Sequence, residues 1–118
     1  MAETSAEQIA LLEARVSELP EWLQAHIERA RMLGRELSPL FSADPERVDI
    51  ALAGHDLYRA ASDVEMLRVA DRLGIVPGAL EIEQPLLLHG PIAAIWMADE
   101  GRVSDKEVLD AVQHHTTF

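Results

Sequence analysis

The chain has 118 residues, with 10 Lys and Arg against 21 Asp and Glu, so its formal net charge is −11 with histidine neutral. This length suits a single domain. The acidic balance argues against a nucleic-acid polymer or an anionic membrane surface as partner, because both attract a basic face. The sequence has no cysteine, which excludes disulfides and zinc–thiolate sites.

The first half of the chain contains three helical patterns. Residues 1–20 predict an N-terminal helix that ends at Pro20, and a second helix runs from Trp22 to the Ser38-Pro39 pair. Asp44 followed by Pro45 predicts the start of a third helix, since aspartate caps helices well and proline suits the first helical position.

The second half contains three more helical patterns. Ser62 and Glu65 form a capping box that opens a helix over residues 64–73, where Gly74 ends it. The apolar run 92–98 predicts another helix.

Ser104 with Glu107 predicts a capping box for the last helix. Strand signals at 74–77 and 81–83 are too short and too close to helix breakers to build a sheet. The sequence therefore predicts an all-α fold, a single bundle of five to six helices.

The first ten residues, MAETSAEQIA, carry acids where an export signal carries positive charge. The longest apolar stretch, 92–98, is far shorter than the roughly 18 residues of a membrane span. We therefore expect a cytoplasmic protein with no membrane partner.

The residues with most chemical information are the histidines. A single histidine is most often a polar side chain satisfied by a hydrogen bond, but His55-Asp56 ends an apolar stretch, where charge is costly unless it is paired or coordinated. Imidazole nitrogens and carboxylate oxygens suit divalent iron, manganese or similar ions. The other histidines are His26, His89, His114 and His115.

Four segments together resemble a known family. His26, then His55-Asp56, then Leu88-His89-Gly90-Pro91, then His115-Thr116-Thr117 resemble the HD-domain metal-dependent phosphohydrolase superfamily, with most similarity to the YqeK-type symmetrical bis(5′-nucleosyl)-tetraphosphatases. The resemblance implies one HD-like helical domain over residues 1–118, with the N-terminal helix in 1–20 and the HD-like core in 21–118.

The resemblance also implies an activity. These enzymes hydrolyse diadenosine tetraphosphate to two ADP, so the expected substrate is a nucleotide or dinucleoside polyphosphate. The expected cofactor is a divalent transition metal, Fe(II) before Mn(II). The implied metal ligands are His26, His55 and Asp56, the implied catalytic residues are His55, Asp56 and Arg59, and the implied substrate contacts are His26, Asp56, His89, His115 and Thr116.

The sequence departs from the family pattern in three places. Arg59 replaces the usual lysine, which keeps the charge but changes its geometry. Gly54 replaces a bulky apolar residue, and Leu57-Tyr58 replaces a smaller pair; we expect Tyr58 to fill core rather than stack on a base. The family's last metal-binding aspartate would follow the His-Thr-Thr segment, so the domain is expected to be incomplete at its C-terminus. His114 is interpreted as a neighbour of the site, not a ligand.

Two alternatives remain open. The chain is either a phosphohydrolase or a catalytically incomplete HD-like module that binds a nucleotide or a protein partner without turnover. In the plainest alternative, several histidines only cap and connect helices. An incomplete bundle with an apolar face beside Phe118 would also favour pairing of two copies into a homodimer.

Overall fold

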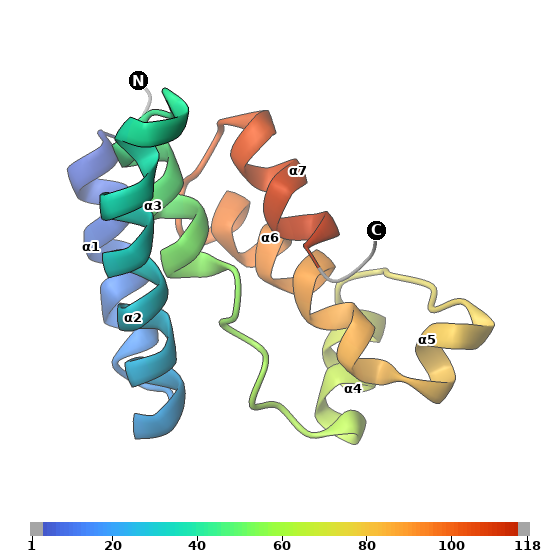
Figure 1. Ribbon diagram of the computed structural model, residues 1–118. Helices are drawn as coiled ribbons and strands as arrows, with labels where there is room; N and C mark the ends of the chain where they lie inside the picture. The colour runs from blue at the N-terminus through green and yellow to red at the C-terminus, as the bar shows by residue number, and fades with distance from the viewer. Residues whose placement is uncertain (1–3, 116–118) are drawn as a thin grey trace.

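The computed structural model describes residues 4–115, and this part of the chain is built from helices with no strand (Figure 1). The predicted all-α class is confirmed. The described residues form a body of 39 × 33 × 28 Å with a radius of gyration of 14.0 Å. The α-helices are α1 (Ser5–Val16), α2 (Glu21–Leu37), α3 (Pro45–Gly54), α4 (Asp63–Arg72), α5 (Ala79–Glu83), α6 (His89–Asp99) and α7 (Lys106–His114), and the 3-10 helices are η1 (Ser38–Phe41) and η2 (Pro85–Leu88).

The predicted helix starts at Asp44 and Ser62 are confirmed. The Asp44 carboxylate accepts the backbone N–H of Glu46, and Pro45 occupies the first helical position of α3. The Ser62 hydroxyl accepts the backbone N–H of Glu65 at the start of α4. In each case a side-chain oxygen satisfies a backbone donor that has no partner within the helix.

The predicted cap of the last helix is wrong by one residue. Asp105, not Ser104, caps α7, because its carboxylate accepts the backbone N–H groups of both Glu107 and Val108. The same carboxylate also accepts two hydrogen bonds from Arg47 on α3, at 2.6 and 3.0 Å. This ion pair ties the start of α7 to α3, a tertiary contact that no local pattern could reveal.

The helix that the sequence did not predict, α5, lies where the sequence showed only a weak strand signal. Its first turn is held by the Glu81 carboxylate, which accepts the backbone N–H of Gly78 at 2.8 Å. Residues 79–83 thus form a single short turn of helix. The expected count of five to six helices is one too low because this turn is too short to show helical periodicity.

The helices form two connected groups, α1 to α3 and α4 to α7 with η2, and the segment between α3 and α4 links them. Helices α1, α2 and α3 pack side by side, α6 packs along α7, and α4 packs against η2 beside α5 (Figure 1). One apolar core lies between α1, α3, α6 and α7, and a smaller one lies between α4, η2 and α6. The connecting segment, which carries Asp56, therefore passes between the two groups.

A buried arginine joins the first three helices. Arg31 on α2 makes a bidentate pair with Asp49 on α3, at 2.8 and 2.9 Å, and a further hydrogen bond to Glu13 on α1 at 3.1 Å. This planar pairing fixes the relative position of α2 and α3. It therefore also fixes the helix that carries His26.

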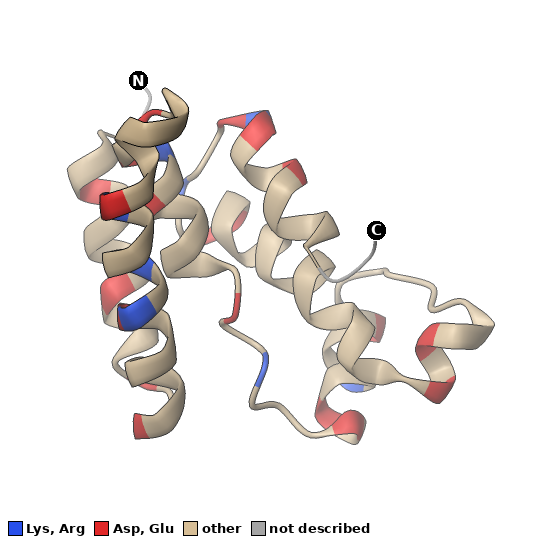
Figure 2. Cartoon of the chain, in the orientation of Figure 1, with Lys and Arg blue, Asp and Glu red and all other residues tan. Residues whose placement is uncertain are grey.

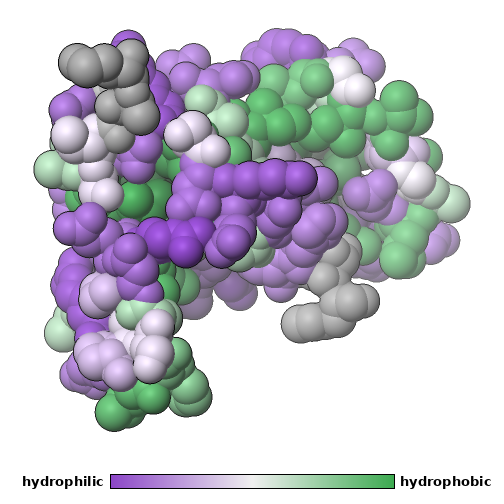
Figure 3. All heavy atoms as spheres, turned by 90° about the horizontal axis from the view of Figure 1, so that it is seen from above, coloured by the Kyte–Doolittle hydropathy of each residue, from purple (hydrophilic) through white to green (hydrophobic). Residues whose placement is uncertain are grey.

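The surface of the described residues is mainly acidic, with separate apolar areas. Figure 2 shows acidic positions spread over most helices and fewer basic ones. Figure 3 shows apolar surface divided by hydrophilic surface; exposed apolar side chains include Leu40, Phe41 and Val76. Among the described helices, none has the length and apolar character that crossing a bilayer requires.

Candidate metal centre

Four histidines converge on one buried carboxylate, that of Asp56, which is 2% exposed. His26 and His55 lie against its Oδ2 atom, and His89 and His115 lie against its Oδ1 atom. The distances from Nε2 to the carboxylate oxygen are 2.9 Å for His26, 3.0 Å for His55, 3.2 Å for His89 and 3.4 Å for His115. Five residues that the sequence predicted as site residues thus meet at one point, although they span 90 positions of the chain.

Three of these histidines stand at helix ends. His55 follows α3, His89 follows η2, and His115 follows α7. Each donates its Nδ1–H to the backbone carbonyl three residues earlier, so the ring is fixed against the end of a helix. The acceptors are the carbonyls of Leu52, Leu86 and Val112. His26 differs, since it projects from the middle of α2.

These backbone bonds determine which ring atom faces Asp56. Because a carbonyl can only accept, Nδ1 must carry the proton, and Nε2 of each neutral ring presents a lone pair to the centre. His89 Nε2 and His115 Nε2 lie 2.9 Å apart, and both are near Asp56 Oδ1. Lone pairs at this separation repel unless a proton or a cation lies among them. The donor set of imidazole nitrogens and carboxylate oxygens therefore fits a divalent transition metal.

Electrostatics keeps Asp56 ionised. Burial alone would raise its pKa, but the imidazoles of His115, His55 and His89 against its oxygens outweigh burial and hold the pKa of Asp56 far below its usual range. For His115, burial lowers the pKa, while the adjacent Asp56 carboxylate and the bond to the Val112 carbonyl raise it; the net pKa is raised. The centre thus holds a permanent negative charge with imidazoles around it, as a cation site requires.

Gly90 brings the last histidine into the cluster. A Cβ atom built at Gly90 would lie 2.8 Å from the carbonyl oxygen of Gln113 and 2.9 Å from that of Val112. Only the absence of a side chain lets the end of α7 approach the start of α6 this closely. His115 can therefore reach His89.

Gly54, where the sequence departs from the family pattern, also has a packing role. A Cβ atom at this position would overlap the side chain of Met97 on α6. Met97 is fully buried and fills the space that a larger residue at position 54 would occupy. The departure is thus compensated within the core directly beside His55.

The remaining predicted site residues lie as follows. Arg59, about half exposed, places its NH1 atom 3.5 Å from Asp56 Oδ2. His114 is exposed at the end of α7. Thr116, predicted to contact substrate, and Phe118, near which an apolar face was expected, lie outside the described residues.

Within residues 4–115, two groups of side chains could each hold a metal ion, and they share Asp56. The first is His26, His55 and Asp56, the set that the sequence resemblance implied. The second is Asp56, His89 and His115, whose ligand atoms also lie within 4.8 Å of one another. Sequence reasoning assigned His89 and His115 to the phosphate pocket and missed this second group, because spacing along the chain cannot show that two helix ends meet.

Comparison with known proteins identifies related sequences. The chain is 33% identical over 82 residues to a Bacillus subtilis protein named symmetrical bis(5′-nucleosyl)-tetraphosphatase, a match that covers 70% of this chain and 44% of that protein. A Staphylococcus aureus protein of the same name is 28% identical over 99 residues, covering 84% of this chain and 50% of the relative. A third of that name, from Halalkalibacterium halodurans, is 29% identical over 82 residues, covering 70% and 43%.

No protein-family model matches the chain, and no solved structure matches it significantly. The family resemblance inferred from the histidine motifs is confirmed by the three relatives. The chain spans about half the length of the curated relatives it matches.

Proposed function

We propose that this chain, a relative of the symmetrical bis(5′-nucleosyl)-tetraphosphatases, carries the metal centre of an HD-type phosphohydrolase that cleaves diadenosine tetraphosphate into two ADP. The observation that supports this most directly is the set of four imidazole Nε2 atoms around the Asp56 carboxylate, with His89 and His115 only 2.9 Å apart. Such a set needs positive charge at its centre.

In this proposal His26, His55 and Asp56 hold one divalent ion, Fe(II) before Mn(II). His89 and His115 hold a second ion, with Asp56 shared between the two. The helix-end carbonyls support the assignment, since a metal-bound histidine commonly donates its other N–H to a backbone carbonyl or carboxylate, which fixes the ring.

When bound, such ions lower the pKa of a coordinated water and polarise a phosphoryl oxygen. The chain's own residues do the rest. Asp56 and the helix-end histidines hold the centre rigidly, while His26 and Arg59 form its more exposed side. Arg59 binds a phosphate oxygen there, because a guanidinium offers several donors in a fixed plane.

The charge of the chain adds a requirement. A tetraphosphate is a polyanion and the chain carries a net charge of −11, so the two repel each other at long range. Substrate binding at the Asp56 centre must then depend on local cations, namely the proposed metal ions and Arg59.

The first experiment measures metal content after anaerobic loading with ferrous or manganous ion. We expect about two ions per chain in the parent and fewer in both His55→Ala and His89→Ala, with helical circular dichroism unchanged. Glu83→Gln, an exposed acid on α5, is the matched control that should bind as the parent does. Metal-dependent release of ADP from diadenosine tetraphosphate is then assayed; turnover that survives in Asp56→Asn would contradict the proposal.

A second candidate is a module that binds nucleotide without turnover. The observation that favours it is that the half-exposed Arg59 guanidinium stands beside Asp56, where it can bind a phosphate without any hydrolysis. Saturable, metal-dependent binding of diadenosine tetraphosphate without ADP release would support this candidate over the first.

A further inference from the structure

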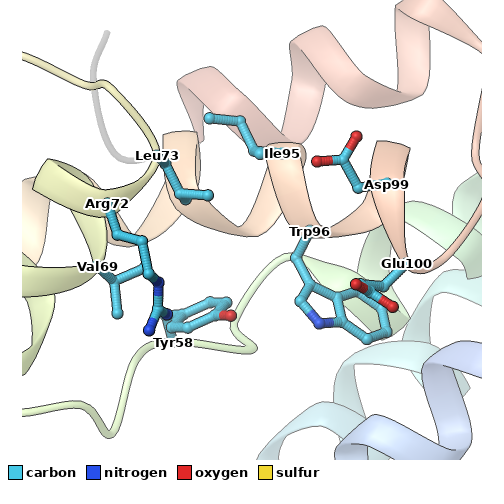
Figure 4. A pocket seen from close by; sticks show the side chains of 8 residues that line it. All are labelled: Tyr58, Val69, Arg72, Leu73, Ile95, Trp96, Asp99 and Glu100. Atoms are coloured by element: carbon cyan, nitrogen blue, oxygen red, sulfur yellow. The ribbon is translucent and has the colours of Figure 1, made fainter.

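A cavity separate from the histidine cluster lies between the end of α4, the second half of α6 and the segment after Asp56 (Figure 4). Its volume is about 330 Å³. Ligand pockets usually enclose about 300–1,000 Å³, so this cavity has room for a single ring system with its substituents and not for a dinucleotide.

Aromatic side chains form two of its walls. Tyr58 comes from the segment after Asp56 and Trp96 from α6, and Figure 4 shows both side chains among the residues that line the cavity. The sequence has only five aromatic residues, so this cavity, with two of them, is enriched in aromatic side chains. Tyr58 was expected to fill core; it packs against both apolar cores and also lines this cavity, with Arg15 over its ring at 5.3 Å from the centroid.

The aliphatic part of the lining comes from Val69, Leu73 and Ile95. Val69 is buried, whereas Leu73 is 38% exposed and lies at the edge of the cavity. A flat, weakly polar ring in this cavity would contact these aliphatic side chains together with Tyr58 or Trp96 and replace water there. Stacking of bases on aromatic side chains stabilises binding in this way.

Charged groups at opposite edges of the cavity give it polarity. Arg72, in the last turn of α4, lies on one side, and Asp99 with Glu100, at the end of α6, lie on the other (Figure 4). None of the three forms an ion pair within residues 4–115, and all are exposed. The negative end of the α6 dipole adds to the acidic side.

We propose that this cavity binds a guanine base. Guanine presents the acceptors O6 and N7 on one edge, which an arginine binds in bidentate fashion, and the donor N2–H₂ on another, which a carboxylate accepts. Arg72 and the Asp99–Glu100 pair supply these two complements. Adenine places an N6–H₂ donor where guanine has O6, so it would point a donor at Arg72.

The inference does not rest on the proposed hydrolase function. None of the cavity residues used here belongs to the Asp56 cluster, and stacking with hydrogen bonding needs no metal. Failure of metal binding or hydrolysis would therefore leave the cavity prediction untouched, and the reverse also holds.

The test uses the fluorescence of Trp96, which lines the cavity, to report binding. Trp22, 57% exposed on α2, is replaced by Phe so that Trp96 is the sole tryptophan. Guanosine, inosine and adenosine are titrated in the presence of a chelator, with calorimetry as a second readout. We expect guanosine to quench Trp96 fluorescence saturably, with a Kd at least tenfold lower than that of adenosine. The Kd of inosine should lie between the two, because inosine lacks N2–H₂.

Variants locate the binding. Arg72→Met should weaken guanosine binding about tenfold, while Arg68→Met, one turn earlier on α4 and exposed, should not. The double variant Asp99→Asn, Glu100→Gln should bind guanosine no more tightly than inosine. Asp71→Asn should keep the difference in affinity between guanosine and inosine. Absence of saturable quenching, equal affinity for guanosine and adenosine, or equal effects of the Arg72 and Arg68 variants would each overturn the proposal.

Discussion

His89 and His115 face each other through Nε2 atoms 2.9 Å apart, while each ring donates its Nδ1–H to the backbone carbonyl three residues earlier, in η2 for His89 and in α7 for His115. Helix capping and the proposed ion binding thus use different nitrogens of the same ring. The alternative that these histidines only cap helices accounts for the Nδ1 bonds, but it does not account for two Nε2 atoms in contact beside a carboxylate. This relationship leads to predictions that separate structural from functional roles.

Asp56→Asn should abolish metal retention with little loss of helix content. The amide keeps the shape of the side chain but removes the negative charge at the centre of four imidazoles. Metal content by elemental analysis is the measurement, and Asp110→Asn, an exposed acid on α7, is the control. Retention of stoichiometric metal by Asp56→Asn would show that the cluster is not a metal site.

Gly90→Ala should destabilise the fold by about 1–3 kcal/mol, the usual cost of adding a methyl group to a closely packed contact. The new Cβ would overlap the carbonyls of Gln113 and Val112 and push the end of α7, with His115, away from α6. Urea unfolding measures the loss, and metal affinity should fall with it. Gly78→Ala is the matched control, because its Cβ would meet only Glu81 Oε1, at 3.5 Å. Equal stability of the two variants would refute the close-contact argument.

Arg59→Ala should lower metal-dependent turnover mainly through a higher KM for the tetraphosphate, with metal content unchanged. Its guanidinium is half exposed beside Asp56, where a phosphate could reach it. Arg59→Lys should recover part of the loss, because it restores charge without the planar fork. Steady-state kinetics decide the matter, with Arg68→Ala as the control. An unchanged KM in Arg59→Ala would show that Arg59 does not bind the phosphate.

The stability provided by Asp49 should depend on pH. A hydrogen bond from Arg31 lowers the pKa of Asp49 below its ordinary value, although burial opposes the effect. A carboxyl group with a lowered folded-state pKa stabilises the fold above its unfolded pKa, about 3.9, and this contribution is lost as the pH falls through the folded value. Asp49→Asn should therefore cost roughly 1.5–3 kcal/mol at pH 7, the range for hydrogen bonds to charged groups, and less at pH 3.

Urea unfolding of the parent and Asp49→Asn at both pH values tests this, because protonation effects elsewhere in the chain are common to the two proteins. A gap in unfolding free energy that stays constant from pH 7 to pH 3 would contradict it. Glu46→Gln, an exposed acid on α3, should show no such pH-dependent gap.

The sequence by itself determined the helical class and most helix boundaries. Asp44 and Ser62 cap helices through bonds to residues two or three positions away, and such local chemistry can be read from the chain. The one-residue error at Ser104 and the unpredicted α5 have the opposite cause. Asp105 is held by Arg47, 58 positions away, and α5 is too short for periodicity to reveal it.

The same division holds for the candidate site. The sequence supplied the types and order of the residues, and the family resemblance carried by His55-Asp56 and the Leu-His-Gly-Pro motif. Only the tertiary structure decided that three helix ends and the middle of α2 meet at Asp56, and that Tyr58 and Trp96 line one cavity. The physical reason is that helix geometry depends on nearby residues, whereas a site between helices depends on packing contacts such as Gly90 against the end of α7, which join positions far apart in the chain.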